Sequence, residues 1–285
     1  MKSDIKRVVV LTHGEPDVAH DALRQSLVLM ADRGVQVLAP RTEWEKHGSL
    51  LAGDDTLPPV VEATDFDGVG LCLVLGGDGT MLRAFHLTRD RCIPVAGVNL
   101  GRVGFLTTVD RADITAGLTR LLDGEFAEYP LLGLEAAVGD QIYRAANDMV
   151  VGKGPRAHAA LLSLNINGVT LFEVTCDGVV VGTPAGSSAY SLAAGGPLLG
   201  ISVDAYVISL VAAHAVGVRP VVAAPGDVLE IVNAGERDCT LDVDGDRSAY
   251  LPPGGTVRIN TTRSMATLAL LVGDSLYHHF RDRLL

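Results

Sequence analysis

Short apolar runs alternate with longer amphipathic segments along the first part of the chain. Residues 8–11 and 71–75 are continuous apolar runs of strand length, whereas residues 18–33 and 80–88 place apolar side chains at helical spacing. This alternation predicts a parallel sheet with helices on its faces. Ligands bind such sheets at the carboxyl ends of the strands, so the residues that follow each strand are the first candidates for a site.

The pattern continues with two strands and a helix, at residues 35–38, 93–98 and 110–122. Residues 41–67 contain several turn signals and are expected to be irregular. From about Leu131 the chain changes to short alternating runs separated by Gly, Asn and Asp, which predicts a mostly β half. Within this half, Asn167-Gly168 between two alternating runs predicts a tight hairpin.

Composition narrows the class of protein. The chain has 285 residues and a formal net charge of −11, which argues against nucleic acid or an anionic membrane as a partner. The longest apolar stretch, residues 205–218, contains Ser209 and His214 and is too short to span a bilayer. Residues 1–7 lack the pattern of a signal peptide, so we expect a cytoplasmic protein. The four cysteines show no C-x-x-C spacing, and no metal site made of protein ligands is predicted.

The apolar run 71–75 ends in Gly76-Gly77-Asp78-Gly79-Thr80. Glycines at a strand-to-helix turn let backbone N–H groups approach an anion, and the start of the helix adds a partial positive charge. A carboxylate beside a phosphate is repelled unless it accepts a proton from an attacking hydroxyl or holds a bridging metal ion. The loop therefore favours phosphoryl transfer. The alternative is that Asp78 only caps the helix.

A second polar block follows the apolar run 179–181, at residues 182–191, and reads Gly-Thr-Pro-Ala-Gly-Ser-Ser-Ala-Tyr-Ser. Several hydroxyl groups crowd around its Pro-Ala-Gly turn. A loop that had only to reverse the chain would not need this density of side-chain donors and acceptors. The block therefore indicates a second binding segment.

Together the two blocks resemble the NAD kinase family of the bacterial type, whose members transfer a phosphoryl group from ATP or polyphosphate to the 2′-hydroxyl of the adenosine ribose of NAD. The resemblance covers most of the chain and follows the family's order. Its other motifs are 97–106, Asn147-Asp148, Asp177-Gly178, Gly195-Gly196-Pro197 and Asp244-Gly245. Lipid kinases of the diacylglycerol and sphingosine type share the glycine-aspartate loop, but they do not carry the Thr-Pro-x-Gly-Ser-x-Ala-Tyr block.

The resemblance implies that Asp78 is the general base that takes the proton from the 2′-hydroxyl. The phosphates would be cradled by Gly76, Gly77, Gly79 and Thr80. Mg²⁺ or another divalent cation would accompany ATP or polyphosphate as the donor. The other residues expected to bind the nucleotides are Arg102, Phe105, Asn147, Asp148, Asp177, Thr183, Ser187, Ser188, Ala189, Tyr190 and Asp244.

Some of these residues have a structural alternative. Phe105 is expected to lie against adenine, although a single Phe often belongs to a core. Arg102 suits a phosphate or a solvated surface. Asn147-Asp148 suits the adenine edge and the ribose hydroxyls, but the same pair is common in simple β-turns.

The resemblance also implies an architecture. We expect an α/β chain with a Rossmann-like parallel-sheet domain at residues 1–110, completed by about residues 268–285, and a mostly β NAD-binding domain at residues 111–267. The C-terminal segment, including the helix-like residues 277–284, should return to the N-terminal domain. In the family the aspartate at position 177 contacts the dinucleotide across a subunit interface, so a homo-oligomer, either a dimer or a tetramer, is implied.

Two departures from the family pattern leave other functions open. Ala185 stands where the family usually has Thr or Ser, and residues 212–220 keep only the His and the Arg-Pro of the family's pattern. One alternative is a kinase of the same fold that acts on another nucleoside or a small alcohol. The other is a non-catalytic dinucleotide-binding homologue, against which the presence of Asp78 argues. The sequence leaves the preferred donor and the choice between NAD and NADH open.

Overall fold

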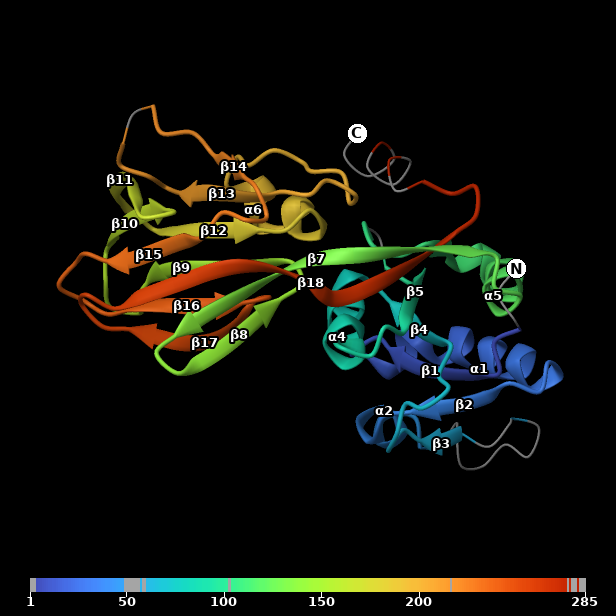
Figure 1. The fold of residues 1–285 in the computed structure, drawn as a ribbon. Coiled ribbons are helices and arrows are strands. Elements are labelled where there is room, and N and C mark those ends of the chain that lie inside the picture. The colour runs from blue at the N-terminus through green and yellow to red at the C-terminus, as the bar shows by residue number, and fades with distance from the viewer. Residues whose placement is uncertain are drawn as a thin grey trace. The chain divides into compact units, whose positions relative to one another are not determined.

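The computed structural model describes residues 4–48, 57, 60–101, 104–215, 217–275, 277 and 281, and its contacts divide into two compact units (Figure 1). Unit 1 comprises Met1–Pro130 and Ala266–Leu285, and unit 2 comprises Leu131–Met265. The boundary predicted after residue 110 lies earlier in the chain than this division. The difference arises because helix α5 (Ile114–Leu122) buries Ile114, Leu118 and Leu121 in the core of unit 1.

Unit 1 is built on a parallel sheet, as the alternating pattern predicted. Its strands are β1 (Arg7–Thr12), β2 (Gln36–Ala39), β3 (Val60–Glu62), β4 (Leu71–Gly76), β5 (Pro94–Asn99), β6 (Val109–Asp110) and the last part of β18 (Thr256–Leu271). Their order is β18-β5-β4-β1-β2-β3, with β6 paired to β5. Thr12 pairs with Leu75, and Gly76 pairs with Asn99, so the carboxyl ends of β1, β4 and β5 meet at one edge.

Helices cover both faces of this sheet. They are α1 (Pro16–Asp32), α2 (Arg41–Lys46), α4 (Asp78–Thr88), η1 (Arg111–Asp113) and α5. Ala96 and Val98 of β5 share a core with α1 and α5, whereas a Cβ added at Gly97 would clash with Met81 of α4. Because side chains alternate along a strand, α4 lies on the face opposite α1 and α5. β4 is buried along its whole length, as expected of a central strand covered on both sides.

The expectation of an irregular segment at 41–67 was wrong at residues 41–46, where α2 forms, and at residues 60–62, where β3 joins the parallel sheet. This helix has only six residues, and Arg41, Glu45 and Lys46 leave it without a continuous apolar stripe. A helix this short gives no periodic signal in a sequence. Its Glu43 is nevertheless buried and bonded to other elements, and this is what holds the helix in place.

Unit 2 consists of antiparallel strands in two sheets. The first holds β14-β13-β12-β9-β16-β17, and the second continues β11-β10-β15-β18, with β7 and β8 beside β18. The strand bounds are β7 (Phe126–Val138), β8 (Gln141–Ala145), β9 (Asp148–Lys153), β10 (Ala160–Ile166), β11 (Val169–Cys176), β12 (Gly178–Gly182), β13 (Tyr206–Val211), β14 (Val221–Ala223), β15 (Leu229–Asn233), β16 (Cys239–Val243) and β17 (Asp246–Leu251). Two short helical segments, η2 (Ala185–Ser188) and α6 (Tyr190–Ala193), follow β12.

Alternating side chains of the two sheets form the core of unit 2, with Val179 and Val181 of one sheet and Leu162 and Leu164 of the other. The predicted hairpin at Asn167-Gly168 is confirmed, because it joins β10 to β11 with φ values of 51° and 79°. Two positive φ values in a two-residue loop give the twist that antiparallel strands need.

The return of the C-terminal segment to the N-terminal sheet is confirmed. The start of β18 pairs with β15 in unit 2, and its end pairs with β5 of unit 1 through Thr267 and Leu268. The predicted helix at 277–284 lies outside the described residues except for Tyr277 and Arg281. In the described part of the chain, no helix is long and apolar enough to cross a membrane.

Candidate active site

The candidate residues of unit 1 surround the turn between β4 and α4. β4 ends at Gly76, Gly77 is the N-cap of α4, and Asp78 is the first residue of the helix. The carbonyl of Gly77 accepts hydrogen bonds from the backbone N–H groups of Thr80 and Met81, each at 3.0 Å. Asp78 is therefore not the capping residue, which leaves its carboxylate for other contacts.

Two backbone amides of a neighbouring loop hold the Asp78 carboxylate. The N–H of Phe105 donates to Oδ2 at 2.9 Å, and the N–H of Leu106 donates to Oδ1 at 3.0 Å. A carboxylate has about four lone-pair positions, so these bonds fix its orientation and still leave positions for a proton. The side chain is oriented by the protein and partly exposed, as a general base requires.

The glycines of the loop are not equivalent. A Cβ added at Gly76 would clash with Oγ1 of Thr80, which is itself 5% exposed and packed beneath the turn. A Cβ added at Gly77 or Gly79 would meet nothing within 4 Å, and Gly77 has an ordinary φ of −113°. The protein itself therefore requires glycine at position 76 only. At the other two positions the backbone is open to the approach of a ligand.

The segment after β5 forms a wall beside Asp78. Oδ1 of Asn99 accepts a hydrogen bond from the N–H of Gly101 at 3.0 Å, and a Cβ added at Gly104 would clash with Oγ1 of Thr107. These contacts bring the amides of Phe105 and Leu106 to the carboxylate. The Phe105 side chain is partly exposed. Arg102 lies outside the described residues.

The first group of candidate residues in unit 2 is a turn at residues 146–148 that is shaped by Asp244. Asp244 and Gly245 both have positive φ, at 47° and 90°, in the tight turn between β16 and β17. The Asp244 carboxylate accepts hydrogen bonds from the backbone N–H groups of Ala146, Asn147 and Asp148, at 2.8, 2.7 and 3.1 Å. Asp244 thus serves the shape of the turn through its carboxylate.

The side chains of Asn147 and Asp148 are buried in this turn. Burial, and then the nearby Asp244, raise the pKa of the Asp148 carboxyl to about 7. Oδ1 of Asn147 is buried and has no hydrogen-bond partner among the described residues. A buried acceptor without a partner and a carboxyl of raised pKa are groups that a bound ribose or base edge would satisfy.

The block from Thr183 to Tyr190 contains side chains of two kinds. Thr183 is fully buried; its Oγ1 donates to the carbonyl of Ala146 at 2.6 Å and accepts from the N–H of Gly186 at 3.0 Å. Ser187 is also fully buried, with Oγ donating to the carbonyl of Pro184 and accepting from the N–H of Leu199. Both hydroxyls are used within the loop.

The end of the block is more open. Oγ of Ser188 has only a long contact, 3.5 Å, to the carbonyl of Ala185, and Ala189 is partly exposed. Tyr190 is 45% exposed. Ala185 is buried. Ser188, Ala189 and Tyr190 are therefore the members of this block that a ligand can reach.

The loop of residues 183–186 packs directly on the 146–148 turn. The N–H of Thr183 donates to the carbonyl of Asn147 at 2.8 Å, and a Cβ added at Gly186 would clash with that same carbonyl oxygen. The two motifs, which lie far apart in the sequence, thus form one surface.

Asp177 lies apart from this surface. β9 and β12 run antiparallel, with Asp148 opposite Gly182 and Gly152 opposite Gly178. Asp177 therefore lies just before the other end of β12, about 17 Å along the strand from the residue opposite Asp148. Its carboxylate accepts a hydrogen bond from Nζ of Lys153 at 2.8 Å. The structure does not bring Asp177 to the other candidate residues of the same chain.

The groups that orient the acidic side chains leave no signal in the sequence. The amides of Phe105 and Leu106 carry no side-chain signal, and nothing in the sequence pairs them with Asp78. The described residues also contain no group of three or more His, Cys, Asp or Glu that could hold a metal ion. They do not form a cage for Mg²⁺.

Comparison with protein families agrees with this arrangement. Residues 9–126 match the ATP-NAD kinase N-terminal domain, and residues 146–271 match the ATP-NAD kinase C-terminal domain. An NAD kinase of Mycobacterium tuberculosis is 34% identical over 98% of this chain and 94% of its own length. NAD kinase 2 of Streptomyces coelicolor is 35% identical over 98% of this chain and 93% of its own length.

Two solved structures share the fold. A yeast NADH kinase crystallised with NADH has a TM-score of 0.88 and 22% identity, covering 99% of this chain and 88% of its own. An NAD kinase from Archaeoglobus fulgidus in complex with ATP has a TM-score of 0.70 and 21% identity, covering 98% of this chain and 97% of its own. Since both family domains match in order and the curated relatives align over almost the whole length, the chain belongs to the NAD kinase family.

Proposed function

We propose that this protein is an NAD kinase that transfers the terminal phosphoryl group of ATP to the 2′-hydroxyl of the adenosine ribose of NAD, which yields NADP and ADP. The observation that carries the proposal is the position of Asp78. Its carboxylate stands at the first turn of α4, is oriented by two backbone amides, and is flanked by two glycines whose backbone faces open space. Family membership supplies the activity itself.

In the proposed reaction Asp78 accepts the proton of the 2′-hydroxyl. The 2′-oxygen attacks the γ-phosphorus, a new O–P bond forms, and the bond from the γ-phosphorus to the bridging oxygen breaks as ADP leaves. The N–H groups at the start of α4 stabilise the charge on the transferring group. Mg²⁺ enters with ATP and neutralises phosphate charge. Polyphosphate is the alternative donor, since it offers the same phosphate chemistry.

The proposed binding roles follow from the hydrogen-bonding groups of each side chain that are not already used within the protein. Asp148 accepts from a ribose hydroxyl, and the unpartnered Oδ1 of Asn147 accepts from the base. Ser188 and Tyr190 contact the dinucleotide, and Phe105 stacks on adenine. Thr183, Ser187 and Asp244 act by shaping the loops that carry these groups.

We further propose that the protein works as a cytoplasmic homo-oligomer. Strand β11 is the last strand of its sheet and leaves Val169 and Leu171 64% and 41% exposed, a surface suited to a second copy. Asp177 lies away from the other candidate residues of its own chain, which fits a role in a neighbouring subunit. Light scattering should detect a dimer or tetramer at assay concentration, and an active monomer would contradict this part of the proposal.

The test of the function is an assay of the purified protein with Mg²⁺, ATP and NAD. We expect NADP to accumulate, as detected by a dehydrogenase specific for NADP, and to require both substrates. Parallel reactions replace ATP with polyphosphate, and NAD with NADH or simple nucleosides. Phosphorylation of a nucleoside without formation of NADP would identify a kinase of the same fold with another acceptor. Binding of NAD without any transfer would identify a non-catalytic homologue.

A further inference from the structure

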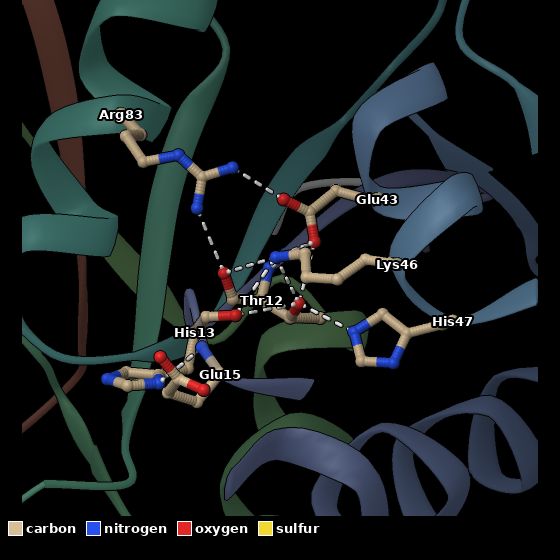
Figure 2. Close-up of polar contacts among 7 residues, drawn as sticks. All are labelled: Thr12, His13, Glu15, Glu43, Lys46, His47 and Arg83. Carbon is tan, nitrogen blue, oxygen red and sulfur yellow. Dashed lines mark hydrogen bonds and ion pairs between the residues drawn. The ribbon is translucent and has the colours of Figure 1, made fainter. Parts of the chain in front are cut away.

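A polar cluster with a buried centre lies at the carboxyl end of β1 in unit 1 (Figure 2). We call Thr12, Glu43, Lys46, His47 and Arg83 the Glu43 cluster. Its members come from β1, α2 and the residue after α2, and α4. None of them was a candidate in the sequence analysis, and the proposed reaction does not use them.

Glu43 is the centre of this cluster, with a side chain that is only 2% exposed. Its Oε2 accepts from the N–H of Thr12 at 3.1 Å, from Oγ1 of Thr12 at 2.6 Å and from Nζ of Lys46 at 2.8 Å. Its Oε1 accepts from Nη2 of Arg83 at 2.6 Å. Burial alone would raise the pKa of Glu43, but these hydrogen bonds outweigh it and lower the pKa, so the side chain is ionised.

The charges of the cluster do not cancel. Lys46, which is 15% exposed, balances Glu43. Burial lowers the pKa of His47, so this side chain is neutral at pH 7. The charge of Arg83 is left over. Because Arg83 is 45% exposed, the cluster presents one net positive charge to solvent at that guanidinium.

The guanidinium is held from one side. Nη1 donates to the carbonyl of Thr12 at 3.1 Å, and Nη2 donates to Glu43. Arginine has five N–H donors in one plane, so two anchored bonds fix that plane while other donors remain for a ligand. A planar fork of this kind matches the oxygens of a phosphate.

Arg83 stands beside the glycine-aspartate loop. It follows Asp78 by five residues on α4, about 7.5 Å along the axis, and long helical side chains lean toward the N-terminus. Its partner Thr12 pairs with Leu75, whose carbonyl also accepts from the N–H of His13 at 2.8 Å. Leu75 directly precedes Gly76. The guanidinium therefore lies at the sheet edge where the loop begins.

We propose that Arg83 binds the phosphate chain of the phosphoryl donor, and that Glu43, Thr12 and Lys46 hold it in position for that contact. The proposal rests on the proposed function, because it names a further residue for the same reaction. The ligand chemistry is a chain of phosphates, whether from ATP or from polyphosphate. Arg83 is a binding residue in this account, and Glu43 is a positioning residue that acts through it.

The test measures binding and turnover separately, with Arg83→Gln and a control, Arg89→Gln. Arg89 follows the other end of α4 and pairs with Asp90, so its loss removes the same charge far from Asp78. The probes are inorganic tripolyphosphate and ATP, each with Mg²⁺. We expect Arg83→Gln to raise both dissociation constants by about tenfold or more, which corresponds to a charged hydrogen bond, and to leave NAD binding within about twofold. Arg89→Gln should match the parent protein.

Two further variants separate binding from folding. Arg83→Lys keeps the charge but not the planar fork and should bind the probes at an intermediate strength, even if Arg83→Gln fails to fold. Glu43→Gln makes the cluster more positive by one charge yet weakens the hold on Arg83, because the amide offers a single uncharged acceptor oxygen. We expect Glu43→Gln to weaken tripolyphosphate binding. Glu43→Asp restores a carboxylate and should recover part of the lost affinity.

The outcomes distinguish a failure of the role proposed for Arg83 from a failure of the proposed NAD kinase function. If the parent protein makes NADP and Arg83→Lys and Arg83→Gln bind both probes as it does, Arg83 is not a donor residue. Tighter binding by Glu43→Gln would show that charge alone matters and would overturn the positioning role. A parent protein that makes no NADP would reject the proposed function instead. A comparison of turnover rates with ATP and with polyphosphate identifies which of the two supplies the phosphate chain that binds at this site.

Discussion

The candidate residues of the two units use their polar groups in different ways. In unit 1 the protein's own backbone orients Asp78, and Gly77 and Gly79 face open space. In unit 2 most of the polar side chains are already bonded within the chain, as Thr183 and Ser187 show. The first region keeps its reactive group available, whereas the second uses its hydroxyls to build a surface.

This difference separates two tasks that a motif can serve. A residue whose polar atoms are satisfied inside the loop affects a ligand only through the shape of the loop. A residue that is oriented but not saturated can act on the ligand directly. The comparison therefore predicts that substitutions of Asp78, Gly77 and Gly79 change rate or donor binding with little loss of stability. In unit 2 a substitution should lower either the stability of the protein or its affinity for the ligand, depending on whether the side chain is bonded within the loop or open.

The largest effect is expected from Asp78→Asn. The amide keeps the size of the side chain but removes the base, so kcat should fall by about 10²–10⁴. The thermal midpoint should fall modestly, since the carbonyl oxygen of Asn can accept from only one of the two backbone amides that Asp78 binds. Steady-state and single-turnover assays of NADP formation measure the loss. Retention of more than about a tenth of the rate would exclude the general-base role.

Gly186 in unit 2 and Gly79 in unit 1 test the comparison, because the same substitution should have opposite effects on stability at the two positions. In Gly186→Ala the new methyl group clashes with the carbonyl of Asn147, so unit 2 should lose about 1–3 kcal/mol or more of unfolding free energy. Gly79→Ala meets no protein atom and lies in a helix, so stability should hold or rise by up to about 1 kcal/mol.

The same Gly79→Ala protein should bind ATP more weakly, because the methyl group occupies the space left for phosphate. Urea unfolding and ATP titration, run on both variants, provide the two readouts. Unchanged ATP binding by Gly79→Ala would mean that the open backbone at this turn serves no ligand.

Two adjacent serines sharpen the comparison inside unit 2. Ser187→Ala removes a buried hydroxyl that bonds Pro184 and Leu199, and should cost about 1–3 kcal/mol of stability. Ser188→Ala removes only a long contact and should leave stability within about 0.5 kcal/mol. It should instead weaken NAD binding by about 0.5–1.5 kcal/mol. Thermal melting measures the stability of the two proteins, and calorimetry measures their affinity for NAD. If Ser188→Ala lowers stability and Ser187→Ala weakens NAD binding instead, the roles assigned to the two serines are wrong.

A further effect concerns pH and Asp148. Its pKa of about 7 exceeds the unfolded value of 3.8, so the folded protein holds a proton that the unfolded chain releases. The resulting stabilisation is complete below about pH 4 and is lost as pH rises through about 7. Asp148→Asn should remove this dependence, as urea unfolding at several pH values would show.

Binding should depend on the same proton in the opposite sense. If ribose hydroxyls donate to the Asp148 carboxylate, NAD favours the ionised form. Affinity should then rise by up to about tenfold per pH unit below pH 7 and level off above it. Calorimetry in buffers of different ionisation enthalpy should detect proton release. A flat profile that Asp148→Asn does not alter would separate Asp148 from the ligand.

Local patterns were enough to predict much of the fold. The strand-length apolar runs and the Asn167-Gly168 turn each carry their signal within a few residues, and both formed as predicted. The glycine-aspartate loop was recognisable for the same reason. The division between the units was harder, because it depends on which core α5 joins, and the amphipathic pattern of a helix does not name its partner.

The polar contacts that orient the site were beyond local patterns. Thr12, Glu43 and Arg83 are separated by 31 to 71 residues and lie in three different elements. The hydroxyls of Thr183 and Ser188 are of the same chemical kind in the sequence, although one is buried and bonded and the other is open. Only the packing of the chain separates a side chain that builds the loop from one that meets a ligand.

The most direct test of this account measures NAD affinity and the rate at saturating NAD for Asp78→Asn and Asp148→Asn side by side. Calorimetry gives the dissociation constant, and a single turnover with Mg²⁺ and ATP gives the rate. We expect Asp78→Asn to keep the dissociation constant within about tenfold while its rate falls by about 10²–10⁴. Asp148→Asn should mainly weaken binding. Loss of NAD binding by Asp78→Asn together with an unaltered dissociation constant for Asp148→Asn would contradict the assignment of chemistry to one region and recognition to the other.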